Sequence, residues 1–228
     1  MIPWLSLDTA KAPGGGELRL MRRGAEFSIR LGANELMNSR LSGSEEALAT
    51  IPCLRIRDRP APRILIGGLG MGFTLRAALA ALGDDASIAV AELVPAVVKW
   101  AQGPMAEVFG NSLSDRRVSL SEGDVGRVIK SARSAYDAIL LDVDNGPEGL
   151  TRQANDALYD TQGLSAARTA LRPGGILAVW SSGPNRNFTL RLRHVGFGVE
   201  EIKVRANGAR GGARHVIWVA TSGARPSS

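Results

Sequence analysis

A glycine-rich run in the first half of the sequence has the spacing of a ligand-binding loop. Residues 64–76 spell ILIGGLGMGFTLR, an apolar segment that breaks into glycines and resumes with helix-forming residues. Gly68, Gly70 and Gly72 lack a Cβ, so their turn can bring free N–H groups close to a ligand. The pattern predicts a cradle for a nucleotide-like molecule, although such a loop can also serve only the packing of a strand on a helix.

Acidic residues follow the next two strand-like segments. Glu92 ends a segment about twenty residues beyond the loop, where a carboxylate in an open parallel sheet can bind both ribose hydroxyls. Asp124 closes the following segment, where it either caps a helix or bonds an adenine amino group while the N–H of Val125 meets a ring nitrogen. One residue can do both. We expect Glu92, Leu93, Asp124 and Val125 to contact a nucleoside; for Glu92 the alternative is a surface turn.

A third acidic group follows the apolar segment 136–141. Carboxylates gathered at the mouth of a crevice are costly unless a cation or a transferable proton is expected there. Asp142 is the best candidate for a general base because a strand would fix it, and Asp144 and Asn145 would orient an amine substrate. Alternatively, Asp144 and Asn145 only cap a turn. Trp180 could wall the same pocket or be a core residue.

The elements that position these residues follow from the hydrophobic pattern. Strand-like and helix-like segments alternate after residue 63, and the early strands are continuously apolar, as in a parallel sheet covered on both faces. Only a short loop separates the last two strands, which should therefore be antiparallel neighbours. The predicted strands are 64–67, 87–92, 118–121, 138–142, 176–181, 199–204 and 216–220. The predicted helices are 73–82, 95–100, 125–132, 161–171 and 187–195.

A smaller unit is expected before this α/β domain. Alternation of apolar and polar residues over 17–37 predicts a small antiparallel sheet, and 45–50 is typical of a short helix capped by serine. Pro3 and the glycine-rich stretch 12–16 predict loose first residues, and the prolines in 57–62 mark a boundary. We therefore assign 1–60 to the small β segment with its helix, 61–222 to a Rossmann-like nucleoside-binding catalytic domain, and 223–228 to a tail.

Composition limits the class of protein and its partners. The 228 residues are 44% hydrophobic and 22% charged, without a bilayer-length apolar run or a signal peptide, so a soluble cytoplasmic protein is expected. A single cysteine, Cys53, and two histidines offer no disulfide or metal site. The net charge of +6 could attract nucleic acid through the arginine-glycine segment 205–214, but a solvated hairpin tip explains that segment better. Nucleic acid is therefore not the expected partner.

The span 63–220 resembles the spermidine synthase-like branch of the polyamine aminopropyltransferases, within the class I S-adenosylmethionine-dependent methyltransferase fold. The motifs that carry the resemblance are GGLGMG at 67–72, VAELV at 90–94, EGD at 122–124, YDAILLD at 136–142, LY at 158–159 and LRPGG at 171–175. It implies a parallel Rossmann-like sheet with an antiparallel last strand, after a small N-terminal antiparallel sheet. It also implies that Glu92 holds ribose, Asp124 adenine and Asp142 the attacking amine. S-adenosylmethionine or its decarboxylated form would be co-substrate, without a metal.

Several positions depart from the family pattern. A loop aspartate is replaced by Met71, the Asp-Ser-Ser-Asp loop by 142–145 (DVDN), a Tyr-His pair by Ser44 and Glu45, and a glutamine by Glu35. The leading hypothesis is aminopropyl transfer to a small amine by in-line displacement at a sulfonium carbon. One alternative is methyl transfer from S-adenosylmethionine, whose carboxyl end would then lie near Met71. Another is a non-catalytic nucleoside- or RNA-binding protein. A second copy could cover the edges of the N-terminal sheet and form a homodimer.

Overall fold

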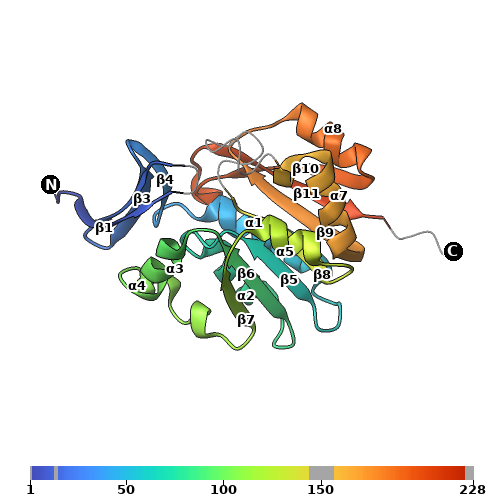
Figure 1. The fold of residues 1–228 in the computed structure, drawn as a ribbon, viewed down its shortest axis with the longest axis horizontal. Coiled ribbons are helices and arrows are strands. Elements are labelled where there is room, and N and C mark those ends of the chain that lie inside the picture. The colour runs from blue at the N-terminus through green and yellow to red at the C-terminus, as the bar shows by residue number, and fades with distance from the viewer. Residues whose placement is uncertain (1, 13–14, 144–156, 224–228) are drawn as a thin grey trace.

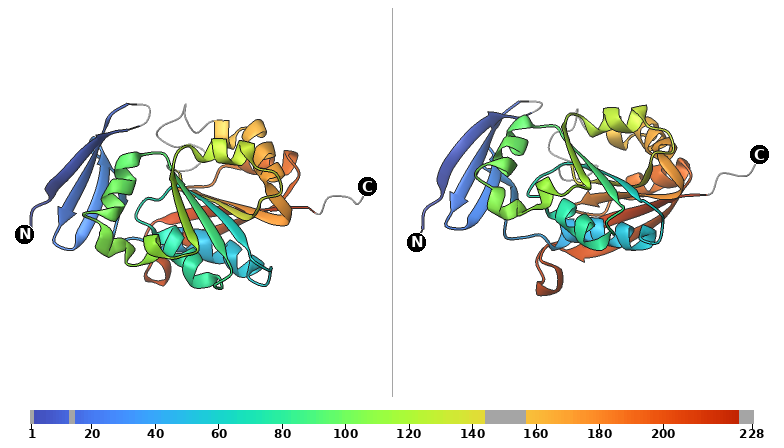
Figure 2. Two further views of the ribbon diagram at one scale, coloured as in Figure 1. Left: turned by 60° about the horizontal axis from the view of Figure 1, so that its bottom comes forward. Right: turned by 90° about the horizontal axis from the view of Figure 1, so that it is seen from below.

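The computed structural model describes residues 2–12, 15–143 and 157–223, which build two sheets (Figure 1). A four-stranded sheet has the order β1-β2-β3-β4, and a seven-stranded sheet has the order β10-β11-β9-β8-β5-β6-β7. The predicted fold class, a Rossmann-like sheet preceded by a small antiparallel one, is confirmed. Figure 2 shows the small sheet at one end of the molecule, beside α3 (Pro95–Gln102) and α4 (Ala106–Phe109).

The large sheet is parallel except at its C-terminal edge. Pairing is parallel from β7 through β6, β5 and β8 to β9, and β11 is antiparallel to both β9 and β10. The predicted antiparallel pair at the end of the chain is thus confirmed. The strands are β5 (Arg63–Gly67), β6 (Ser87–Glu92), β7 (Val118–Glu122), β8 (Tyr136–Leu141), β9 (Leu171–Ser181), β10 (Phe197–Arg205) and β11 (Arg214–Ser222).

Helices cover both faces of this sheet, which explains why its central strands are continuously apolar. One apolar cluster joins the sheet to α1 (Gly43–Ile56), α2 (Phe73–Ala81) and α3. The other cluster joins the opposite face to α5 (Val125–Ser131), α7 (Thr161–Ala170) and α8 (Arg186–His194). Short 3₁₀ turns complete the described elements, η1 (Ser112–Ser114) and η2 (Gly208–Arg210). Among the described residues no helix is long and apolar enough to cross a membrane.

Helix α1 differs from its prediction in three ways. It spans Gly43–Ile56 instead of 45–50, because Leu48, Cys53 and Ile56 recur at helical spacing and are buried against the large sheet. A serine, Ser42, occupies the N-cap as predicted, but its side chain makes no capping hydrogen bond. The sequence grouped this helix with the N-terminal segment, whereas in the structure it packs against α2, β8 and β9.

The N-terminal sheet contains one strand more than the sequence predicted. The strands β2 (Glu17–Arg23), β3 (Glu26–Leu31) and β4 (Asn34–Asn38) form the expected antiparallel sheet. The expectation of loose first residues is wrong, because β1 (Leu5–Lys11) pairs with β2. A carboxylate oxygen of Asp8 accepts a hydrogen bond of 2.8 Å from Trp100 Nε1, which ties β1 to α3.

Candidate active site

A cavity of about 150 Å³ lies between the N-terminal sheet and the carboxyl ends of β5, β6, β7 and β8. Most residues that the sequence assigned to a nucleoside or a base meet there. Those that line it are Gly68, Gly70, Glu92, Leu93, Asp124, Val125 and Asp142. Carboxyl ends of parallel strands share one edge of the sheet, which explains why residues distant in sequence converge. Two others, Gly72 and Trp180, are not among the lining residues.

The glycines of the loop have different roles. Gly68 has a φ of +92°, and a Cβ there would clash with the carbonyl oxygen of Asp142, so only glycine lets the loop lie against the end of β8. Gly70 lines the cavity. At Gly72, with a φ of +73°, a Cβ would clash with the Phe109 ring. The structure thus places Gly72 in a packing contact, where the sequence predicted a ligand contact.

Glu92 fixes the loop from the end of β6. Its Oε2 accepts a hydrogen bond of 2.8 Å from Leu69 N, and its Oε1 accepts one of 2.8 Å from Val94 N. Burial raises the pKa of Glu92, although the backbone amides oppose the rise. Glu92 also lines the cavity, so a ligand there would meet a carboxylate that backbone amides already orient.

Asp124 is the N-cap residue of α5. Its Oδ1 accepts a hydrogen bond of 2.8 Å from Gly126 N, and the residue also lines the cavity. The capping alternative is therefore what the structure contains, and contact with a ligand stays a prediction. Val125 follows with a buried side chain that also lines the cavity.

Asp142 comes directly after β8, and its backbone N donates to the carbonyl of Gly67 at 2.9 Å. The carboxylate Oδ2 accepts a hydrogen bond of 2.8 Å from Thr74 Oγ1. Burial, followed by the charges of Glu45 and Glu92, raises the pKa of Asp142 to about 7. A carboxyl with this pKa can exchange protons near neutral pH, as a general base must.

The wall opposite the sheet ends was missed by the sequence analysis. It is apolar and comes from the end of β1, from β2, β3 and β4: Ala12, Leu18, Ile29, Leu31, Leu36 and Met37. Alternation over 17–37 showed that one face of the small sheet is apolar, but not what that face covers. In the structure this face both packs on the core and closes the cavity.

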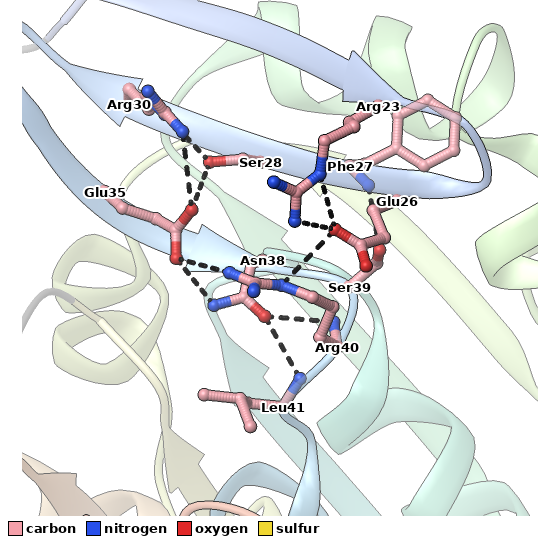
Figure 3. A network of polar contacts seen from close by, with 10 residues as sticks. All are labelled: Arg23, Glu26, Phe27, Ser28, Arg30, Glu35, Asn38, Ser39, Arg40 and Leu41. Carbon is pink, nitrogen blue, oxygen red and sulfur yellow. Dashed lines mark hydrogen bonds and ion pairs between the residues drawn. The ribbon is translucent and has the colours of Figure 1, made fainter. Parts of the chain in front are cut away.

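Two positions that depart from the family pattern take no part in the lining. Met71 is only 3% exposed and packs in the core, so Gly70 and not Met71 faces the cavity from the loop. Glu35 lies in a polar network on the N-terminal sheet, where Ser28 Oγ donates to it at 2.7 Å and Asn38 Nδ2 at 2.8 Å (Figure 3). Arg40 Nη2 also bonds Glu35, at 3.4 Å.

Three predicted substrate contacts remain. Trp180 does not wall the cavity; its ring packs edge-on against His215, with the centroids 4.7 Å apart. Asp144 and Asn145 lie outside the described residues. Within the described part of the chain, no group of three His, Cys, Asp or Glu residues could hold a metal ion.

No family model matches the chain. It is 31% identical over 137 residues to the polyamine aminopropyltransferase of Korarchaeum cryptofilum, covering 60% of this chain and 40% of that protein. It is 30% identical over 132 residues to polyamine aminopropyltransferase 2 of Pseudomonas aeruginosa, covering 56% of this chain and 35% of the relative. The matched segments therefore span less than half the length of these curated relatives.

Solved structures extend the likeness over nearly all of the chain. A spermidine synthase in complex with the transition-state analogue AdoDATO superposes with a TM-score of 0.74 at 16% identity, over 97% of this chain and 73% of the other. The spermidine synthase of Thermotoga maritima gives 0.74 at 15% identity, over 97% and 74%. At these low identities the likeness shows the fold alone. The chain therefore has the fold of the spermidine synthases and is similar in sequence, over part of its length, to polyamine aminopropyltransferases.

Proposed function

We propose that the chain is a transferase that binds decarboxylated S-adenosylmethionine and transfers its aminopropyl group to a small amine. The observation that carries the proposal is Asp142, a carboxyl with a pKa of about 7 at the edge of a glycine-loop cavity. Similarity to proteins named polyamine aminopropyltransferases supports the same reaction. No resident metal is part of the proposal.

The nucleoside would occupy the part of the cavity bounded by the glycine loop and the ends of β6 and β7. Glu92 would bind the ribose hydroxyls, and Leu93 would contact the ring beside it. Asp124 would accept a hydrogen bond from the adenine amino group, while the N–H of Val125 would meet a ring nitrogen. Backbone N–H groups near Gly68 and Gly70 would contribute further polar contacts.

The charges in the cavity favour the decarboxylated co-substrate. Described lining residues include the carboxylates of Glu92, Asp124 and Asp142, and no Lys, Arg or His. The carboxylate of intact S-adenosylmethionine would meet no opposite charge on this lining and would be repelled by the acidic groups. The decarboxylated form carries only an ammonium and a sulfonium, which the acidic groups attract. Methyl transfer from the intact form is therefore the weaker candidate.

The transfer itself requires an aligned and deprotonated amine. Asp142 would take one proton from the substrate ammonium, and the freed nitrogen lone pair would attack the aminopropyl carbon next to sulfur. The new N–C bond forms as the C–S bond breaks, and the electron pair of that bond leaves with sulfur as neutral methylthioadenosine. Because a sulfonium is already a good leaving group, positioning supplies most of the catalysis. In this proposal Asp144 and Asn145 anchor the amine.

Calorimetric titration tests the choice of co-substrate. The purified protein is titrated in parallel with decarboxylated S-adenosylmethionine, S-adenosylmethionine and methylthioadenosine. We expect the decarboxylated form to bind most tightly, because it alone adds a positive charge without a negative one. Tighter binding of the intact form would move the proposal to methyl transfer. An absence of heat with all three would contradict nucleoside binding altogether.

Two related expectations stay predictions. A cytoplasmic location was predicted from Cys53, the single cysteine of the sequence, which cannot form a disulfide within the chain. A homodimer would cover β1, an edge strand whose Leu5 and Leu7 are exposed. Light scattering after size-exclusion chromatography distinguishes a dimer of the 24.1 kDa chain from a monomer.

A further inference from the structure

Beside the cavity, a short hydrogen-bonded chain links three side chains from opposite ends of the sequence. Ser44 Oγ donates to Glu45 Oε2 at 2.6 Å, and His215 Nδ1 lies 3.0 Å from the same hydroxyl oxygen. A serine hydroxyl has a single proton to give. Since Glu45 receives it, the network assigns the proton of the second bond to His215 Nδ1, which donates to Ser44. The chain therefore points from the imidazole toward the Glu45 carboxylate.

Packing holds this chain in place. Ser44 is only 1% exposed at the start of α1, and His215 near the start of β11 is partly buried. The Trp180 ring lies edge-on to the His215 imidazole at an interplanar angle of 69°. The Ser44 hydroxyl that holds Glu45 is thus supported by His215 of β11 and Trp180 of β9, so the orientation of Glu45 does not depend on helix α1 alone.

The Thr74 hydroxyl lies between the Asp142 carboxylate and the backbone of Glu45. Thr74 Oγ1 donates to Asp142 Oδ2 at 2.8 Å and lies 3.3 Å from the backbone carbonyl oxygen of Glu45. Of the described elements around Asp142, α1 presents the charge of Glu45, β6 presents that of Glu92, and α2 presents the neutral Thr74. Asp142 therefore has acidic neighbours and a hydroxyl, without a described cation among them.

Two carboxyls in such surroundings do not both ionise readily. Burial raises the pKa of Glu45, while the Ser44 hydrogen bond favours its charged form. Burial and the charge of Glu45 raise the pKa of Asp142. Like-charged neighbours of this kind titrate as a pair, with the first proton lost easily and the second retained to higher pH.

We propose that Glu45 is a positioning residue that, oriented by Ser44 and His215, lies close enough to Asp142 to disfavour ionisation of both carboxyls together. In the resting protein the two carboxyls then carry one negative charge between them, which leaves one carboxylate able to accept a proton from a substrate ammonium. This use of the pair rests on the proposed function, whereas the coupled ionisation is a property of the ligand-free protein.

The test is a carboxyl titration of the ligand-free protein by NMR, after ¹³C labelling of aspartate and glutamate. The Asp142 signal is assigned by its loss in Asp142→Asn. In Glu45→Gln we expect the midpoint of Asp142 to fall by about one pH unit, because a repulsive charge is removed while burial remains. Glu46→Gln is the matched control, since Glu46 is exposed on the same helical turn. An Asp142 midpoint that moves equally in both variants would overturn the proposal.

A second variant tests the orientation of Glu45. Ser44→Ala removes the donor that favours the charged form of Glu45, so the Asp142 midpoint should fall by less than in Glu45→Gln. An unchanged midpoint would contradict the role of Ser44. If thermal melting shows that Glu45→Gln does not fold, Ser44→Ala carries the test. Failure of the wild-type protein to turn over any amine would contradict the proposed function but leave the titration result standing.

With turnover established, the pH profile gives an independent readout. The acid limb of kcat/KM for decarboxylated S-adenosylmethionine and an amine reports the base in the free enzyme. We expect this limb to move to lower pH in Glu45→Gln and to stay in place in Glu46→Gln. A change in turnover without a shift of the limb would indicate a merely structural role for Glu45 and would overturn the proposal.

Discussion

The two ends of strand β8 each carry an aspartate, and the two differ in their partners. Asp137, near the start of the strand, is 1% exposed and is paired with Arg59 at 2.9 Å and Arg172 at 2.8 Å. Its Oδ2 also accepts from Arg63 N at 2.8 Å. Asp142, just past the other end, has a hydroxyl partner and two acidic neighbours.

The difference separates structural charge from charge that is available for chemistry. Asp137 joins the start of β8 to residues near β5 and β9, and its charge is fully compensated there. The described neighbours of Asp142 include no positive charge, so a cationic ligand can neutralise its carboxylate. In β8, the partly buried and uncompensated Asp142 at the carboxyl end thus belongs to the candidate site, while the buried and compensated Asp137 near the amino end makes a fold contact.

The largest effect should follow loss of the uncompensated acid. Asp142→Asn keeps the shape of the side chain but removes the proton acceptor, and we expect turnover to fall by about 10²–10⁴-fold. Steady-state kinetics with decarboxylated S-adenosylmethionine and an amine measures the loss. Glu46→Gln is the control and should retain wild-type turnover. Full activity of Asp142→Asn would show that another group is the base.

The compensated acid should instead control stability. Asp137→Asn leaves two arginines beside a neutral amide, and we expect a loss of about 2–3 kcal/mol in the free energy of unfolding. The figure is below that of a fully buried pair because both arginines are about a third exposed. Denaturant unfolding measures it. Equal stability of Asp137→Asn and the wild type would break the proposed contrast between the ends of β8.

The pH dependence of stability should report the raised pKa of Asp142. Asp142 has a folded pKa of about 7, above the ordinary value, so the folded state binds more protons than the unfolded state over this interval. The stability that Asp142 contributes to the folded state is therefore fully present below the pKa that Asp142 has in the unfolded chain. That stability is lost as the pH rises through about 7, the folded pKa. Asp142→Asn should therefore reduce the decline in the free energy of unfolding between pH 5 and 8, as measured by denaturant unfolding at each pH. A decline that is equally steep in the variant would show that other groups cause it.

Local signals account for what the sequence predicted well. Strand-like runs that end at or shortly before Glu92, Asp124 and Asp142 identify strand ends, and parallel topology then brings those ends to one edge. The glycine loop was also predictable from a local signal, because a backbone with a positive φ, as at Gly68, favours glycine in the sequence. Strand β1 was missed because most of its residues are exposed, and its order comes from pairing with β2 and from the Asp8–Trp100 bond.

Side-chain direction and distant partners were beyond the sequence. The part of β9 that the sequence predicted, 176–181, is apolar as far as Trp180 and gives no alternation from which to infer the direction of that side chain. The sequence therefore left a place at the cavity and a place in the core open for Trp180, and Trp180 is not among the residues that line the cavity. Ser44 and Glu45 stood out only as departures from a family pattern. Their meaning depends on His215, which is 171 positions away from Ser44 in sequence. A buried polar pair at such separation leaves no periodic signal.

The smallest effect is expected at Glu35, an exposed acid with many partners. Glu35 accepts from Ser28, Asn38 and Arg40 and lies 3.9 Å from Arg30 (Figure 3). Exposed pairs contribute little, so Glu35→Gln should cost at most about 1 kcal/mol of stability. Because Glu35 does not line the cavity, binding of decarboxylated S-adenosylmethionine by calorimetry should be unchanged. A loss of binding would place this acid in the site despite its partners and would show that compensation by neighbours does not distinguish structural carboxylates from functional ones.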